Sequence, residues 1–336
     1  MDIAKGNKNN IFARIFQVQW MSILLGVVLL TVVLSILQPS FSSFINLRNI
    51  LVQASAVGIM AVGMTFVIMT GGIDISVGMN LFLMMTIMSE LQKFLPPIFV
   101  LLSAIIGSVL VGAFNGFLVC NLKITPFIAT FATLSICRGL GYWIIKSQMR
   151  SVVEGVRVIG STRLFDIIPV PVIIWILLCI VGFFILSTTR FGRYVLAVGN
   201  SVNSAQASGI PVNKVKFGAY ICSALCAGLA SLVYIGRLGT VQADLGYGLE
   251  FQVITAVVLG GTKLIGGKGT IIGGFIGAIF LILTENGISL MELNIFTYDI
   301  ARGLLLFIAV VLDIVSYTRQ QKTLIRERAM RLRLSL

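Results

Sequence analysis

The residue types that perform acid–base, nucleophilic or metal chemistry are sparse in this chain, and their spacing does not indicate an active site. The sequence contains no histidine, which excludes a histidine-ligated metal site, a Ser-His-Asp triad and a histidine proton relay. Five cysteines are scattered through apolar runs without a Cys-x-x-Cys pair, a pattern that predicts reduced, buried thiols. We therefore expect a protein that is not an enzyme and that binds no metal or cofactor itself.

One acidic residue, Asp74, lies in the segment 71–78 (GGIDISVG) between two apolar runs. The adjacent glycines Gly71 and Gly72 cost about 2 kcal/mol of helix propensity, and an aspartate at membrane depth costs about 2.5 to 3.5 kcal/mol. The sequence therefore predicts a helix break, which persists at that depth only where protein covers it or water reaches it. Two interpretations of Asp74 stay open: a structural cap for a helix restarting at Val77, or a group near a transport path or gate.

A second break is predicted at Gly260 and Gly261, where an apolar run ends, a short polar piece follows and an apolar run resumes. Interrupted segments at comparable places in two halves indicate an internally repeated transporter. The later glycines do not form a phosphate-binding P-loop ending at Lys268, because that pattern needs Gly at position 262 and Ser or Thr at 269. Their spacing of four residues, at 269, 273 and 277, instead favours close helix packing.

The elements that must position these residues are membrane helices. Of the 336 residues, 57% are hydrophobic and only 11% are charged, against about 25% charged in a soluble domain, and the mean hydropathy is +1.02. Since a span needs about 20 apolar residues, we expect one transmembrane domain over residues 1–336, all-α, with about ten helices and broken or re-entrant segments. The predicted apolar runs are 20–37, 50–70, 77–91, 98–120, 126–145, 170–186, 217–238, 251–264, 269–283 and 300–317.

The net charge of +13 is better explained by membrane orientation than by nucleic-acid binding. An even number of spans places both termini on one side, and with that side in the cytoplasm 16 of the 25 basic residues lie inside and 7 outside. We therefore expect a cytoplasmic N-terminus (1–19) and a basic cytoplasmic tail (318–336), whose partner is anionic lipid or another protein. The outer loop 146–169, with four basic residues, fits the rule poorly.

The longest inside loop, 187–216, contains a short stretch of small and polar residues with basic residues on both sides. Gly199 and the segment 209–211 bracket it as helix start and stop signals. This punctuation favours a short helix that docks a cytoplasmic protein over a solvated linker. The docking residues are Asn203, Ser204, Ala205, Gln206, Ala207, Ser208 and Gly209, and we expect Ala205→Arg or Gly209→Glu to abolish docking without unfolding the protein.

Seven short segments lie in order between about residue 50 and residue 313: 71–78, 125–130 (TPFIAT), 190–193 (RFGR), 197–199 (AVG), 209–210 (GI), 256–262 (AVVLGGT) and 286–287 (NG). With these segments the sequence resembles the permease subunits of bacterial ribose-type ABC sugar importers. The resemblance implies a ten-helix permease of type II importer architecture in the bacterial inner membrane. The segment 203–208 then corresponds to the coupling helix, although the family usually has arginine where this chain has Gln206.

The resemblance also implies partners and a mechanism. A separate ATP-binding subunit would hold ATP and magnesium, a periplasmic binding protein would deliver the sugar, and a second permease copy would complete a homodimer or a paralogous heterodimer. Alternating access would then move the solute. Candidate residues of the translocation path are Asp74, Asn115, Thr130 and Asn286. A secondary transporter, or an ABC permease for an autoinducer, a nucleoside or a branched-chain amino acid, stays an alternative, and a membrane-embedded enzyme is less favoured.

Overall fold

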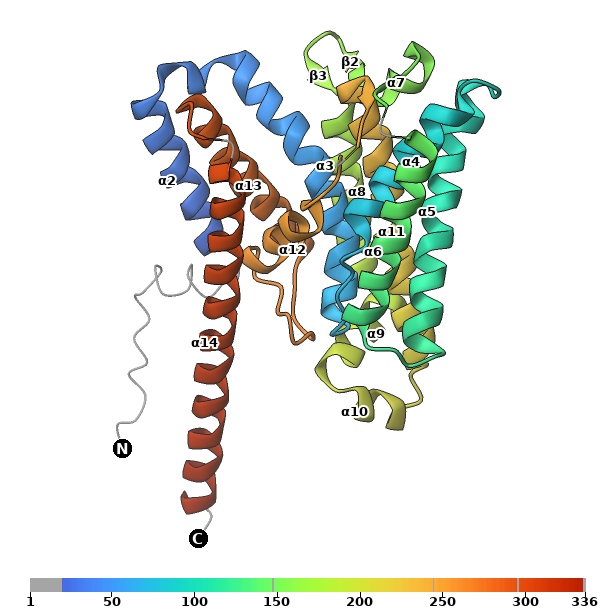
Figure 1. Cartoon of the computed structure of the whole chain (residues 1–336). Helices are drawn as coiled ribbons and strands as arrows, with labels where there is room; N and C mark the ends of the chain where they lie inside the picture. The colour runs from blue at the N-terminus through green and yellow to red at the C-terminus, as the bar shows by residue number, and fades with distance from the viewer. Residues whose placement is uncertain (1–19, 147, 244, 295, 335–336) are drawn as a thin grey trace.

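The computed structural model describes residues 20–146, 148–243, 245–294 and 296–334, so the predicted cytoplasmic N-terminus (1–19) lies outside the described residues. The described chain is predominantly helical (Figure 1), which confirms the all-α prediction of about ten membrane helices. The helices that match the predicted runs are α2 (Met21–Leu37), α3 (Phe44–Met69), α4 (Val77–Leu91), α5 (Pro97–Cys120), α6 (Pro126–Ile145), α8 (Val170–Thr188), α11 (Val212–Leu238), α12 (Leu249–Leu259), α13 (Ile271–Leu290) and α14 (Phe296–Leu334).

Among the described residues, six helices are long and apolar enough to cross a membrane: α3, α5, α6, α8, α11 and α13. Helices α2, α4 and α12 are apolar but shorter, with 17, 15 and 11 residues. The predicted run 251–264 is too long at its end, because α12 stops at Leu259 and Gly261 takes a left-handed backbone conformation (φ 92°). The predicted run 269–283 is too short, since α13 continues to Leu290.

Helices α3 and α11 form the centre of the molecule. In the most apolar stretch of each helix, 83% of the residues are buried inside the protein in α3 and 67% in α11. The corresponding share is 28% in α5 and in α8, so these two helices present more surface to lipid. Helix α11 packs against both α3 and α5. A side chain at Gly63 would collide with the backbone of Cys222 and Ser223, and one at Gly112 with Ala224, so these glycines allow the helices to approach closely.

Small elements cover one end of the helices, at the top of Figure 1. They are β1 (Arg150–Ser151), α7 (Glu154–Ser161), β2 (Arg163–Leu164), β3 (Ile168–Pro169) and β4 (Thr240–Val241). Strand β1 pairs antiparallel with β4, and β2 with β3. Helix α7 packs on α11, and Arg150 forms an ion pair with Glu90 of α4. Part of the basic charge in the loop 146–169 therefore serves internal contacts.

The opposite end carries the connection between α8 and α11. It contains α9 (Arg190–Asn200) and α10 (Val202–Ala207), at the bottom of Figure 1. The 3-10 turn η1 (Pro39–Ser42) joins α2 to α3. Helix α14 runs without interruption to Leu334, so residues 318–334 of the predicted tail belong to this helix.

Candidate functional site

Helix α10 is a short, surface-exposed helix with defined ends. The Ser201 hydroxyl accepts a hydrogen bond from the Ser204 backbone N–H at 3.2 Å, which caps the first turn. Gly209 follows the helix with φ +77°, a left-handed conformation that glycine adopts without strain. The helix thus begins at the Ser201 cap, and the start signal predicted at Gly199 is wrong, because Gly199 lies inside α9.

Six of the seven residues predicted to dock a partner are exposed in the structure: Asn203, Ser204, Gln206, Ala207, Ser208 and Gly209. The seventh, Ala205, is 3% exposed and belongs to the hydrophobic core. An arginine at Ala205 would therefore disrupt internal packing, and a glutamate at Gly209 would strain a left-handed backbone. Both substitutions expected from the sequence to test docking alone would also disturb the fold.

Helix α9 connects α10 directly to both interrupted segments of the membrane domain. The backbone N–H of Gly267 donates a hydrogen bond to the carbonyl oxygen of Met69 at 3.0 Å, which joins the polar piece after α12 to the end of α3. A side chain at Gly199 would collide with that same carbonyl and with the Gly267 nitrogen. We call Met69, Gly199 and Gly267 the glycine junction, since it brings three backbone segments into direct contact.

The predicted helix breaks lie beside this junction. Helix α3 ends at Met69, immediately before Thr70, Gly71 and Gly72, and α12 ends at Leu259, immediately before Gly260 and Gly261. Gly71 and Gly261 both have positive φ, at +76° and +92°. A side chain at Gly260 would also collide with the backbone of Gly273, so this glycine allows α13 to pack against the end of α12.

Asp74 lies inside the first break, is 1% exposed, and accepts several hydrogen bonds. Its Oδ1 atom accepts from the Ser76 backbone N–H at 3.0 Å and from the Ser76 hydroxyl at 2.6 Å. Its Oδ2 atom accepts from the Ser223 hydroxyl of α11 at 2.8 Å. The Asn115 amide of α5 donates to Ser76 at 2.9 Å and to Asp74 at 3.4 Å. The carboxylate therefore ties the break to α5 and α11.

Thr130 joins the same cluster from α6. Its hydroxyl oxygen accepts a hydrogen bond from the Ile75 backbone N–H at 3.3 Å, and the hydroxyl donates to the Pro126 carbonyl at 2.9 Å. Three of the four residues predicted for the translocation path, Asp74, Asn115 and Thr130, thus meet around one stretch of non-helical backbone. We call them, with Ser76 and Ser223, the Asp74 cluster.

Asn286, the fourth predicted path residue, lies elsewhere. Its side-chain amide exchanges two hydrogen bonds with that of Asn46, at 2.9 and 2.8 Å, and this pair holds α13 against the start of α3. The two asparagines are 240 residues apart in the sequence, so local sequence patterns could not predict that they pair.

We predict that Asp74→Asn lowers the stability of the protein. The substitution places an amide donor among hydroxyl and N–H donors, and each buried group left unsatisfied costs about 1–3 kcal/mol. We expect a fall of several degrees in Tm, measured by scanning fluorimetry on the purified protein. Asp166→Asn is the matched control, because Asp166 is exposed and its left-handed conformation (φ 56°) suits asparagine. Equal Tm values for the two variants would contradict this role of Asp74.

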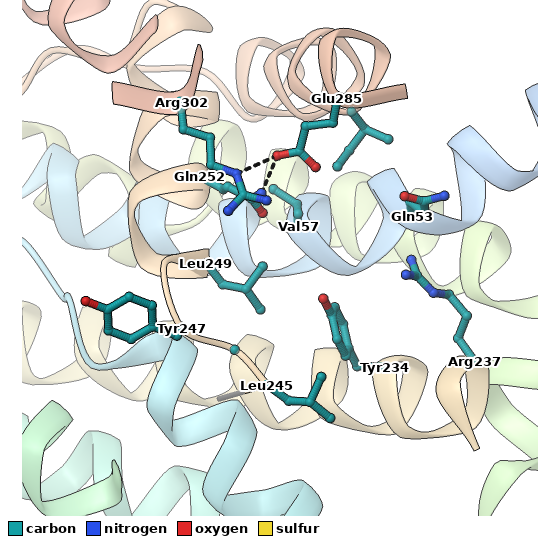
Figure 2. A pocket seen from close by; sticks show the side chains of 12 residues that line it. Gln53, Val57, Tyr234, Arg237, Leu245, Tyr247, Leu249, Gln252, Glu285 and Arg302 are labelled. Atoms are coloured by element: carbon teal, nitrogen blue, oxygen red, sulfur yellow. Dashed lines mark hydrogen bonds and ion pairs between the residues drawn. The ribbon is translucent and has the colours of Figure 1, made fainter. Parts of the chain in front are cut away.

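A polar cavity of about 250 Å³ lies between α3, α11, α12, α13 and α14, and sequence reasoning missed it. Figure 2 shows the labelled side chains around it, with Gln53 and Arg237 on one side and Gln252, Glu285 and Arg302 on another. The lining residues are Gln53, Val57, Tyr234, Arg237, Leu245, Gly246, Tyr247, Leu249, Gln252, Ile282, Glu285 and Arg302. In the sequence, the signal for this cavity is the presence of two charged residues, Glu285 and Arg302, near apolar runs. Their spacing does not predict that they form an ion pair.

Comparison with known proteins agrees with this architecture. Residues 46–310 match the family model described as branched-chain amino acid transport system / permease component. Ribose import permease protein RbsC of Haemophilus influenzae is 35% identical over 297 residues, covering 86% of this chain and 91% of that protein. RbsC of Bacillus subtilis is 37% identical over 295 residues, with coverage of 86% and 91%.

Autoinducer 2 import system permease protein LsrC of an Enterobacter species is 34% identical over 307 residues, covering 87% of this chain and 86% of that protein. No solved structure matches the chain with significance. The resemblance to ribose-type permeases inferred from the segments 71–78 and 256–262 is thereby confirmed. Because the family model spans most of its length, the chain belongs to the branched-chain amino acid transport system / permease component family.

Proposed function

We propose that this chain is the membrane permease subunit of an ATP-binding cassette importer that carries a monosaccharide similar to ribose. The observation that carries the proposal is the similarity to two ribose import permeases, each over 86% of this chain. The scarcity of charged groups inside the spans agrees with a neutral solute. An ion-coupled transporter would leave the exposed, capped helix α10 without a role.

The proposed mechanism couples ATP hydrolysis on a partner subunit to movement of the broken helices. The exposed residues of α10 dock the ATP-binding subunit, which holds ATP and magnesium, whereas this chain binds no cofactor. Movement of α10 reaches the ends of α3 and α12 through the glycine junction, because Gly199 of α9 contacts both Met69 and Gly267. A packed backbone contact transmits displacement without needing a flexible side chain.

The proposed assembly has α10 in the cytoplasm of a bacterium and the loop 146–169 on the periplasmic side of the inner membrane. Both termini are then cytoplasmic. A periplasmic binding protein delivers the sugar, and a second permease copy, identical or paralogous, completes the pathway. In this assembly Asp74, Asn115 and Thr130 hold the helices that border the path around the first break, and Asn286 holds α13 against α3.

The experiment that tests the proposal is uptake of radiolabelled D-ribose by proteoliposomes containing the permease, its ATP-binding subunit and its binding protein. We expect uptake that requires enclosed ATP and that persists when a protonophore removes the proton gradient. Uptake that follows the proton gradient and ignores ATP would overturn the proposal.

A second candidate solute is autoinducer 2, because the LsrC relative is 34% identical over 87% of this chain. Competition in the same uptake assay separates the two solutes. For a ribose permease, excess unlabelled D-ribose suppresses uptake of the label and autoinducer 2 does not. If excess autoinducer 2 suppresses uptake of the label and unlabelled D-ribose does not, the imported solute is autoinducer 2.

A further inference from the structure

The cavity between α3, α11, α12, α13 and α14 presents polar groups that the fold itself does not use. Among the described residues, the Gln53 amide and the Tyr234 hydroxyl have no hydrogen-bond partner. The Arg237 guanidinium has no acidic partner there either, and lies over the Tyr234 ring at 5.4 Å from its centroid. Polar groups inside a membrane domain are costly unless they serve a function.

The other wall of the cavity consists of side chains that hold one another in place. The Glu285 Oε1 atom accepts hydrogen bonds from Arg302 Nε, at 2.8 Å, and from the Gln252 amide. This network neutralises the Arg302 charge and fixes the direction of each group, as the dashed lines in Figure 2 show. A pre-ordered polar wall lowers the entropy cost of binding a ligand.

The chemistry of the lining matches hydroxyl groups better than an anion. A hydroxyl both donates and accepts, and the lining offers donors from Arg237, acceptors from Glu285 and both kinds from Gln53 and Gln252. An anion offers acceptors only, so it would leave the acceptor oxygens of Gln53, Gln252 and Glu285 without a donor from the ligand. Drug-sized ligands occupy about 300–1,000 Å³, so a cavity of about 250 Å³ suits a smaller molecule. The rings of Tyr234 and Tyr247 add apolar faces to the lining.

The position of the cavity suits a ligand that enters from the side opposite α10. Helix α11 starts just after α10 and runs away from it, so Tyr234 and Arg237 lie near its far end. Gln53 lies in the first half of α3, whose other end, Met69, contacts the glycine junction. Glu285 similarly lies in the second half of α13.

We propose that this cavity is a binding site for a neutral, polyhydroxylated ligand of monosaccharide size, within a single permease chain. Gln53, Tyr234 and Arg237 form the hydrogen bonds to the ligand, and Gln252, Glu285 and Arg302 form the fixed wall opposite. The inference rests on the proposed function, since it supplies the place where the imported sugar first contacts the permease.

The test uses Gln53→Leu and Tyr234→Phe in the complete importer, reconstituted in proteoliposomes with saturating binding protein. Each variant removes one set of hydrogen bonds while nearly conserving volume. We expect the maximal rate of D-ribose uptake to fall about fivefold in each, as one lost hydrogen bond implies, with the Tm unchanged. Tyr298→Phe on α14 is the matched control, because Tyr298 does not line the cavity.

Direct binding provides a second readout on the full-length permease in nanodiscs, measured by saturation-transfer difference NMR with D-ribose, other monosaccharides and ribose 5-phosphate as probes. We expect a neutral sugar to give a signal in wild type and in Tyr298→Phe, and a weakened signal in the two cavity variants. Stronger saturation of ribose 5-phosphate than of neutral sugars would overturn the proposal, because it would identify an anion site.

The two proposals fail in different ways. Normal D-ribose uptake by wild type, Gln53→Leu and Tyr234→Phe alike would overturn the cavity site and leave the proposed function standing. Absence of D-ribose uptake by the wild-type importer would overturn ribose as the solute. In that case the NMR comparison still tests the cavity site. A neutral sugar whose signal weakens in Gln53→Leu would support the site. If none of the neutral sugars gives such a signal, the cavity proposal is refuted.

Discussion

Ala207→Arg on helix α10 will abolish co-purification of the ATP-binding subunit with the permease and leave the permease folded. Ala207 is exposed, so an arginine there has room in the isolated chain. In the assembled importer the same charge would be buried in a protein interface without a partner, which costs about 3–5 kcal/mol. Since 1.4 kcal/mol is a factor of ten, affinity should fall by more than 100-fold.

Pull-down of the ATP-binding subunit by the tagged permease measures this effect, with Tm as the check on folding. Ser161→Arg on α7 is the matched control, because Ser161 is an exposed residue of a short helix at the opposite end of the molecule. Retained co-purification of Ala207→Arg would remove the docking role from α10. Ala205→Arg is not a substitute, since Ala205 is 3% exposed and its replacement disturbs the packing of α10 itself.

Gly199→Ala will lower stability and stop transport even though it adds a single methyl group. The new Cβ would collide with the Met69 carbonyl oxygen and the Gly267 nitrogen, which are backbone atoms and share a hydrogen bond. Overpacking of a rigid site costs about 1–3 kcal/mol, and here it also separates α9 from the two helix breaks. We expect a Tm several degrees lower and an ATPase rate that no longer responds to binding protein and sugar.

Gly139→Ala separates this packing effect from helix propensity. Gly139 also lies inside a helix, α6, and a Cβ there meets no atom within 4 Å. Both substitutions gain about 1 kcal/mol of helix propensity, so the difference between them isolates the contact at the glycine junction. We expect Gly139→Ala to keep wild-type uptake and to have a Tm at or above that of wild type. Gly199→Ala with wild-type uptake and a coupled ATPase would show that the junction does not transmit movement.

Patterns local in sequence predicted most of the fold. Membrane helices follow from runs of apolar residues, because the bilayer removes every alternative that leaves backbone groups unpaired. The break after Met69 was visible in Gly71 and Gly72 for the same local reason, since adjacent glycines weaken a helix wherever they occur. The boundaries of α12 and α13 were less accurate, because positive φ at Gly261 and packing at Gly273 decide them.

The candidate site was only partly predictable. Asp74 was identified from its type and depth, but its partners Asn115 and Ser223 come from α5 and α11, which only tertiary packing brings to it. The exposed surface of α10 was predicted as a segment, yet the inward direction of Ala205 depends on how α10 lies against its neighbours. Hydrogen bonds between distant residues leave no local signal in a single sequence.

The sequence by itself determined that this protein is a helical membrane permease, with two interrupted segments and one short helix in the longest predicted inside loop. Composition, glycine pairs and loop punctuation are each properties of neighbouring residues, and a bilayer converts them directly into structure. Only the tertiary structure decided that Gly199, Met69 and Gly267 meet, and that Gln53, Tyr234 and Arg237 face one cavity. The physical reason is that these contacts join segments far apart in the chain, and helix packing alone decides which residues meet.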